Sequence, residues 1–258
     1  MPGPGRRDGP VRAAAELVAE RGAAGELRLP VQRSQAPLVL RRTAEAVYLV
    51  SGAAGPLGGD VLTLRIEVRA GARLRLRTVA AAVALPGRYG QESRLTVTAT
   101  VAAGARLEYL PEPMVAADGA RHRTDVSVRL AADATLVLRD EVLLGRHGER
   151  GGACRTRLSV DRAGASDWAS GWRPLLRHEL DLDGADEAGR GPAVLAGHRA
   201  AGTLLTVGPD VTGEPEVNPW VTVMPLAGPG VLITALAGDT LTLRQRLTRR
   251  VDQHQLTA

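Results

Sequence analysis

The sequence predicts an all-β protein, made of stacked antiparallel sheets that are built from amphipathic hairpins, with at most a few short helices. Apolar and polar residues alternate strictly over three long segments, residues 62–76, 95–109 and 126–138. A period of two places successive side chains on opposite faces of a strand, so each segment has one face to bury. With 44% hydrophobic but only 2% aromatic residues, the predicted core consists of Leu, Val and Ala.

A short turn interrupts each alternation without changing its phase. The three turns are residues 69–71, 102–104 and 131–133, and their third residues are Gly, Gly and Asp. A three-residue hairpin loop preserves the parity of the apolar positions, and its third residue takes a left-handed conformation that suits these residue types. The pattern favours hairpins, and the alternative is a strand that turns a corner without pairing with itself.

The hairpin interpretation specifies which side chains face each other across the strands. Glu67 should face Arg73, Arg65 should face Arg75, and, in the third segment, Asp125 should face Arg139. Opposite charges in such positions are mildly stabilising and like charges mildly destabilising. The spacing of the turns, about 30 residues, suggests stacked β units rather than a strict solenoid.

The remaining segments are assigned less uniformly. Residues 11–20 have the Ala and Glu content of a short helix, whereas the β context makes a first strand equally acceptable. Residues 217–238 are uncharged but contain Pro and Gly, so they predict buried strands joined by turns rather than a membrane span. Residues 231–243 resemble a further hairpin. We expect residues 1–10 to be disordered and the chain, 1–258, to form a single domain.

Composition excludes several classes of function. All 33 basic residues are Arg, so a Walker-type phosphate loop, a pyridoxal phosphate aldimine and a kinase-type ATP site are excluded, because each requires Lys. Cys154 is the single cysteine, which excludes a disulfide framework or a multi-cysteine zinc site within one chain. With no signal peptide evident, we expect a cytoplasmic protein.

The excess of positive charge is local. Residues 65–88 contain six Arg and one Glu, which accounts for the whole formal charge of +5. The simpler interpretation is a solvated strand face. The sharper one is a docking face for an acidic partner, formed by the side chains of Arg65, Arg73, Arg75 and Arg77.

Two loops carry candidate functional residues. The Gly-rich run 52–60 leads into a strand rather than a helix, so it does not predict a phosphate cradle. Residues 143–149 place an imidazole, a guanidinium and a carboxylate after an apolar strand. Asp140 and Glu141 are adjacent and should therefore point to opposite faces, so they do not form a ready acid/base pair. No catalytic site is evident.

These segments, in this order, resemble the urease accessory protein family UreD, also called UreH. The matching segments are GAAGPLGGD (52–60), VRAGARLRLRTVAAAVALPG (68–87), GARLEYLPEPMVAADGARHR (104–123), LAADATLVLRDEVLLGRHGERGG (130–152) and PAVLAGHRAAGTLL (192–205). The chain departs from the family at 77–85, where a Thr-Thr-Gln-containing stretch is usual and only Thr78 remains. The resemblance covers essentially the whole chain.

The resemblance implies a non-enzymatic protein with a β-rich fold and few helices. Such proteins bind UreF, which recruits the nickel-carrying GTPase UreG, and the assembly docks on apo-urease to deliver nickel. The family motifs correspond here to Gly58, Gly59, Asp60, Glu141, Gly145, Arg146 and Glu149. The candidate nickel-route residues are Asp60, Glu141, His147 and Glu149.

Under this hypothesis no cofactor is bound stably, although nickel can pass transiently. Isolated carboxylates and imidazoles suit transfer, because a closed cage of N and S ligands would trap Ni²⁺. Loss of Asp60 or Glu141 should then lower urease activation more than complex formation. The alternative hypotheses are an Arg-faced binding module for another acidic protein or a nucleic acid, and a hydrolase that uses Asp60 and Glu141 across a groove.

Overall fold

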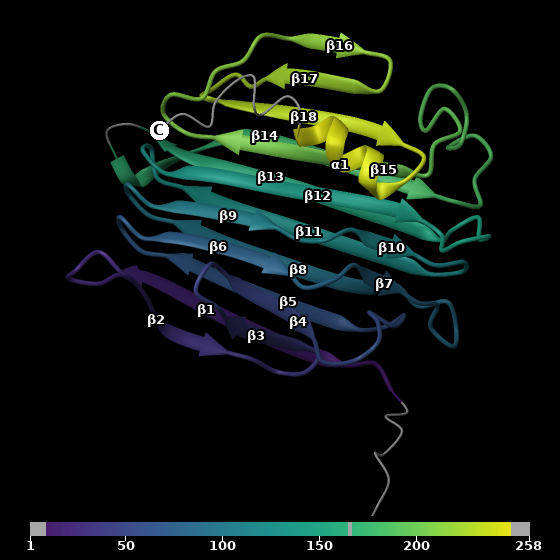
Figure 1. Ribbon diagram of the computed structural model, residues 1–258, viewed down its shortest axis with the longest axis horizontal. Helices are drawn as coiled ribbons and strands as arrows, with labels where there is room; N and C mark the ends of the chain where they lie inside the picture. The colour runs from purple at the N-terminus through teal and green to yellow at the C-terminus, as the bar shows by residue number, and fades with distance from the viewer. Residues whose placement is uncertain (1–8, 165–166, 249–258) are drawn as a thin grey trace, which may run out of the picture.

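The computed structural model describes residues 9–164 and 167–248, and for residues 167–170 it describes the backbone alone. Within these residues there are eighteen strands and one short helix, in two stacked sheets (Figure 1). The all-β prediction is therefore confirmed. In the described part of the chain, no helix combines the length and the apolarity that a membrane span requires.

The first sheet has seven strands. Their order is β14 (Asp167–Asp183), β13 (Ala153–Gly164), β11 (Arg121–Leu130), β8 (Ser93–Val101), β5 (Val61–Val68), β1 (Arg12–Arg21) and β2 (Leu27–Arg33). The pairs from β1 through β13 are parallel, and only the outermost pairs, β1–β2 and β13–β14, are antiparallel.

The second sheet has eleven strands. Nine follow the order β16 (Glu216–Asn218), β17 (Val221–Pro225), β18 (Gly230–Ala237), β15 (Ala200–Val207), β12 (Thr135–Leu144), β9 (Arg106–Leu110), β6 (Arg73–Thr78), β4 (Val47–Ser51) and β3 (Leu38–Arg42). The short strands β7 (Ala82–Ala84) and β10 (Met114–Ala116) are attached beside β12. Here too the central pairs, from β4 to β12, are parallel.

The predicted hairpins are wrong, and the corner alternative is what the structure contains. After β5 the chain turns at residues 69–72 and enters the opposite sheet as β6, instead of pairing with β5. The backbone N–H of Ala72 donates to the carbonyl of Arg69 at 3.0 Å. Equivalent bonds close the turns at residues 102–105 and 131–134, with distances of 3.1 Å in both.

The corner turns meet the conformational expectation in two cases out of three. Gly71 and Gly104 have φ values of 66° and 62°, in the left-handed region that glycine enters without steric cost. Asp133, at the equivalent position, does not have a positive φ. Successive corners also stack on one another, because the N–H of Gly71 donates to the carbonyl of Ala103 at 2.9 Å.

The cross-strand pairs that hairpins would create are consequently absent. Arg65 is instead level with Thr98 on the parallel neighbour β8, and Arg73 is level with Arg106 on β9. Arg65 lies on the outer face of the first sheet, whereas Arg73, Arg75 and Arg77 lie on the outer face of the second. The four arginines therefore do not share one surface.

The preserved parity directs the apolar residues of both sheets into the space between them. Leu64 on β5 and Leu76 on β6 are completely buried there, together with equivalent residues of the following strands. Burial of a side chain of this size contributes about 2 kcal/mol. One aliphatic cluster thus joins the two sheets.

Two ambiguous segments are now assigned. Residues 12–21 form β1, a parallel neighbour of β5, so long-range pairing overrides the local helical composition. The second half of the hairpin expected at 231–243 is instead the helix α1 (Thr240–Thr248), capped by Asp239, whose Oδ1 accepts the N–H of Thr242 at 2.8 Å. Strands separated by turns do occupy 217–238, as predicted, but only β18 is mostly buried, and Val217 on β16 is 81% exposed. Most of the segment expected to be disordered, residues 1–8, lies outside the described residues.

The two ends of the stacked sheets differ. We call one the corner end, because it contains the short turns 69–72, 102–105 and 131–134. The other, which we call the loop end, contains the longer segments 52–60, 79–92, 111–120 and 145–152, and it lies at the right of Figure 1, beside β7 and β10. Both family motifs are at the loop end.

Engineered disulfides distinguish the corner from the hairpin. The double substitution Arg65→Cys and Thr98→Cys places thiols on adjacent strands, within the usual Cα–Cα range of a disulfide. We expect it to crosslink under mild oxidation, as measured by mass spectrometry of the intact chain. The matched pair Glu67→Cys and Arg73→Cys should stay reduced, and crosslinking of this pair instead would contradict the corner.

Candidate functional site, a polar row between the sheets

The Gly-Gly-Asp motif closes the first loop at the loop end. The carboxylate of Asp60 accepts the N–H of Val11 at 2.8 Å and the N–H of Leu57 at 2.9 Å. A Cβ at Gly58 would lie 2.3 Å from the backbone nitrogen of Gly87, so only glycine allows the two loops to approach this closely. Asp60 is buried, and its carboxylate joins this loop to the residue that precedes β1.

The second motif forms a compact turn after β12. Glu149 accepts the backbone N–H of Arg146 at 2.8 Å and that of Asp118 at 3.3 Å, and it also pairs with the Arg146 guanidinium. These hydrogen bonds lower the pKa of Glu149 to about 2, and those from the side chain and backbone of Arg146 have the largest effect. Gly145 has a φ of 72°, and His147 is exposed on the same turn. The side chain of Glu149 thus has local structural partners.

Glu141 faces outward from the second sheet, toward α1. Its side chain is fully buried, with one oxygen 3.2 Å from Nε of Arg139 and 2.5 Å from Nη2 of Arg244 on the helix. Arg244 also pairs with Glu112 at 3.0 Å. The nearby helix residues Leu243 and Leu247 are fully buried in a second apolar cluster with residues of β15 and β18. The ion pairs of Glu141 therefore help hold the helix on the sheet.

A different set of polar residues lies between the sheets. Toward the loop end, the inward positions of the first sheet change from aliphatic to polar. Ser93, His122 and Cys154 occupy level positions on β8, β11 and β13. Asp60 directly precedes β5 and lies beside Ser93, since the N–H of Arg94 donates to its carbonyl. Neighbouring strands are about 4.8 Å apart, so these four residues form a row about 14 Å long.

Hydrogen bonds fix the imidazole in the middle of this row. Nδ1 of His122 lies 2.8 Å from Oγ of Ser93, and Nε2 lies 3.1 Å from Oγ1 of Thr124. Burial lowers the pKa of His122 to about 4, because the charged form would lose its hydration. The ring is therefore neutral at pH 7, which is the form that binds metal ions.

Asp140 approaches the row from the second sheet. It lies in phase with the buried residues Leu138 and Val142 of β12, and so faces the interior. Burial raises its pKa to about 6, with the Thr156 side chain opposing the shift as a hydrogen-bond partner. The buried thiol of Cys154 is close enough for Asp140 to add to the rise in its pKa that burial causes.

The row and Asp140 contain donor atoms of kinds that bind cations. Carboxylate, imidazole and sulfur groups are all available ligands for a borderline transition metal. Nevertheless, nowhere in the described residues do three or more His, Cys, Asp or Glu side chains gather in a way that could hold a metal ion. The candidate donor atoms are instead spread along the row.

Of the residues expected to form a site, the structure places only Asp60 in the interior row. Glu141 and Glu149 have ion-pair partners elsewhere, and His147 is exposed. Asp60 and Glu141 lie on opposite sides of the second sheet and do not converge, which removes the basis for the proposed hydrolase.

Sequence reasoning missed Ser93, His122 and Asp140, although a signal was present. Each lies in phase with an apolar alternation when that alternation is extended toward the loop end. His122 continues the even positions that begin at Val126, and Asp140 continues those that end at Leu138. The inward direction of all three could have been inferred from this phase.

Comparison with known proteins defines the class as the urease accessory proteins. Residues 11–255 match the family described as UreD urease accessory protein. The chain therefore belongs to the UreD family.

Individual relatives support the same family assignment. A urease accessory protein UreD of Frankia alni is 48% identical over 276 aligned positions, covering 94% of this chain and 93% of the relative. Similar proteins with the same name in Parafrankia sp. and Streptomyces coelicolor are 46% and 42% identical, over 92% and 93% of this chain and 86% and 95% of their own lengths. The similarity thus extends over nearly the whole of each protein.

The buried ion pairs of Glu141 predict that removing its charge destabilises the protein. Glu141→Gln should lower the free energy of unfolding by about 3 kcal/mol, because it leaves two guanidinium groups without their buried carboxylate. Chemical denaturation measures this. The control Glu16→Gln removes an exposed pair with Arg33 and should cost under about 1 kcal/mol. Similar losses for both variants would contradict the structural role.

The raised pKa of Asp140 predicts that its contribution to stability depends on pH. Between pH 3.8 and about pH 6, the carboxyl of Asp140 is protonated in the folded chain and ionised in the unfolded chain. The contribution of Asp140 to stability therefore falls as the pH rises through this range, and the full penalty is present above it. Asp140→Asn should raise the Tm near neutral pH and raise it less near pH 4. Equal shifts of the Tm at both pH values would contradict the raised pKa.

Proposed function

We propose that this protein is a non-enzymatic urease maturation factor that docks on apo-urease and helps deliver nickel from a complex of UreF-type and UreG-type proteins. Its membership of the UreD family supports the general role in urease maturation. In this proposal the protein acts in the cytoplasm, and nickel is a passing cargo rather than a resident cofactor.

One observation carries the proposal for nickel: the carboxyl of Asp140 faces the space between the sheets, close to Thr156 and Cys154. A partly buried carboxyl with a raised pKa reduces stability at neutral pH, and such groups are concentrated at functional sites. With Asp60, Ser93, His122 and Cys154 it supplies oxygen, nitrogen and sulfur atoms in the interior. We propose that Ni²⁺ passes along this row between the sheets.

The absence of Lys from this chain bears on which protein of the complex would hydrolyse nucleotide. Without Lys it has no phosphate-loop lysine, so nucleotide hydrolysis would belong to the UreG-type partner. The relatives are named as accessory proteins, which fits a non-enzymatic role. This chain would then contribute a rigid β scaffold and an interior path.

The substitution Asp140→Asn tests the path separately from docking. In cells that co-express urease and its accessory proteins, we expect it to lower the nickel content and activity of urease several-fold, because the amide removes the ionisable oxygen. Co-purification with the UreF-type protein and urease should be unchanged.

Asp181→Asn is the matched control, since Asp181 is exposed and pairs with Arg155 on the outer face of the first sheet. It should leave nickel loading intact. Full nickel loading with Asp140→Asn would overturn the interior path. Failure of the unaltered chain to co-purify with the UreF-type protein or urease would overturn the docking role.

A further inference from the structure

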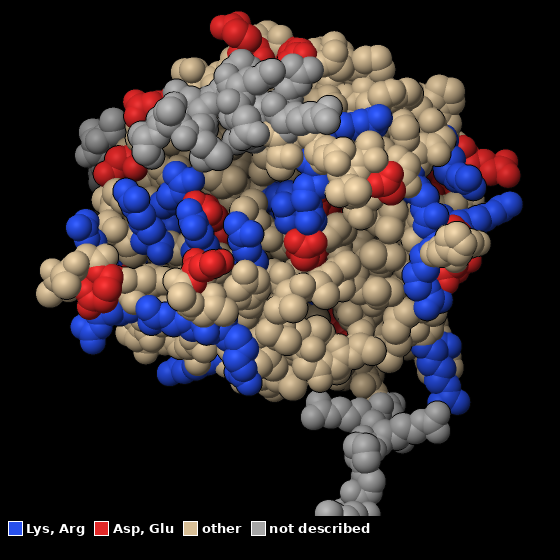
Figure 2. Space-filling model, in the orientation of Figure 1, with Lys and Arg blue, Asp and Glu red and all other residues tan. Residues whose placement is uncertain are grey.

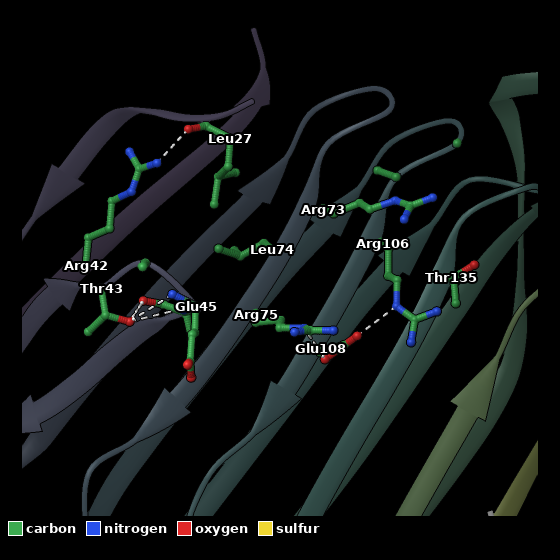
Figure 3. Close-up of a pocket in the computed structure, with 14 residues that line it drawn as sticks. Leu27, Arg42, Thr43, Glu45, Arg73, Leu74, Arg75, Arg106, Glu108 and Thr135 are labelled. Atoms are coloured by element: carbon green, nitrogen blue, oxygen red, sulfur yellow. Dashed lines mark hydrogen bonds and ion pairs between the residues drawn. The ribbon is translucent and has the colours of Figure 1, made fainter. Parts of the chain in front are cut away.

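A groove of about 580 Å³ lies on the outer face of the second sheet, at the corner end. Its walls come from the starts of β6 and β9 and from the turn between β3 and β4 (Figure 3). Neither family motif contributes a residue to it. It is separate from the interior row, because the second sheet lies between them.

Guanidinium groups dominate the lining. Arg42, Arg73, Arg75 and Arg106 border the groove, and Figure 3 shows the last three side by side on the outer face of β6 and β9. Basic side chains also gather over this end of the molecule in the space-filling view, with a few acidic ones between them (Figure 2). The groove is therefore a local positive region.

The carboxylates of the groove do not neutralise it. Glu108 is shared, because its two oxygens lie 3.0 Å from Nε of Arg75 and 2.9 Å from Nε of Arg106. Among the described residues, no carboxylate pairs with Arg73, which lies directly beside Arg106 on the next strand. Adjacent like charges repel, and a carboxylate supplied from outside would relieve this repulsion.

We propose that this groove binds an acidic segment of a partner protein. Guanidinium groups bind carboxylates through paired N–H donors, and Arg73 and Arg106 are placed to receive one together. The proposal goes beyond the nickel function, since it concerns a different surface and a ligand of a different chemistry.

The groove fits a peptide better than a nucleic acid. The carboxylates of Glu45 and Glu108 lie among the arginines, where they would repel a continuous phosphate backbone but can accept N–H groups from a peptide. The lining also contains no aromatic side chain on which bases could stack.

Fluorescence anisotropy with the full chain tests the proposal. The probe is a labelled peptide of alternating Glu and Gly, compared with the same peptide containing Gln in place of Glu. We expect the Glu peptide to bind and the Gln peptide not to bind, with an affinity that falls as salt is added.

Matched charge reversals locate the binding site. Arg73→Glu and Arg106→Glu should each weaken binding about tenfold or more, whereas Arg65→Glu, on the outer face of the first sheet, should not. Circular dichroism melting checks that each variant is folded. If a variant unfolds, Arg73→Gln or Arg106→Gln replaces it, and the same loss is expected.

Three results would overturn the proposal. The first is an absence of binding by the Glu peptide, and the second is an equal loss of binding with Arg65→Glu. The third is tighter binding of a labelled single-stranded DNA that Arg73→Glu abolishes, which would identify the groove as a nucleic-acid site.

Discussion

The architecture depends on one constraint at the corners: the chain must leave one sheet and enter the other with its apolar side chains still on the inner side. A turn that shifted the pattern by one residue would expose every apolar side chain of the following strand. The turns closed by Arg69 and Ala72, and by their equivalents, meet this constraint. Because each corner also bonds to the next, the strands of successive coils align in parallel, and the interior polar residues fall at level positions.

The fold class could be predicted from the sequence, but the pairing of the strands could not. The phase at Leu62–Leu76 is the same for a hairpin with a three-residue loop and for a corner, so the local pattern does not distinguish them. Parallel pairing of Arg65 with Thr98 joins residues 33 positions apart, and no local propensity encodes such a contact. The same limitation applies to residues 12–21, whose strand depends on β5 as a neighbour.

The candidate site could be predicted only in part, because its contacts also join residues that are far apart in the sequence. Alternation predicted correctly that Asp140 and Glu141 point to opposite faces, but the resemblance drew attention to Glu141 rather than to Asp140. The partner of Glu141, Arg244, is 103 residues away in the sequence. It lies on a helix whose Leu241 and Leu243 imitate the alternation of a strand. The ion pair therefore becomes visible only once the helix is placed.

The same contact between α1 and the sheet has a consequence for folding during synthesis. Successive coils can form as they emerge from the ribosome, because each pairs with the one before it. The outer sides of β15 and β18 differ, since Leu243 and Leu247, which cover them, are made later than both strands. Until the helix is made, this apolar surface is uncovered and the carboxylate of Glu141 lacks the guanidinium of Arg244. The nascent chain can therefore aggregate through this surface until its helix is complete.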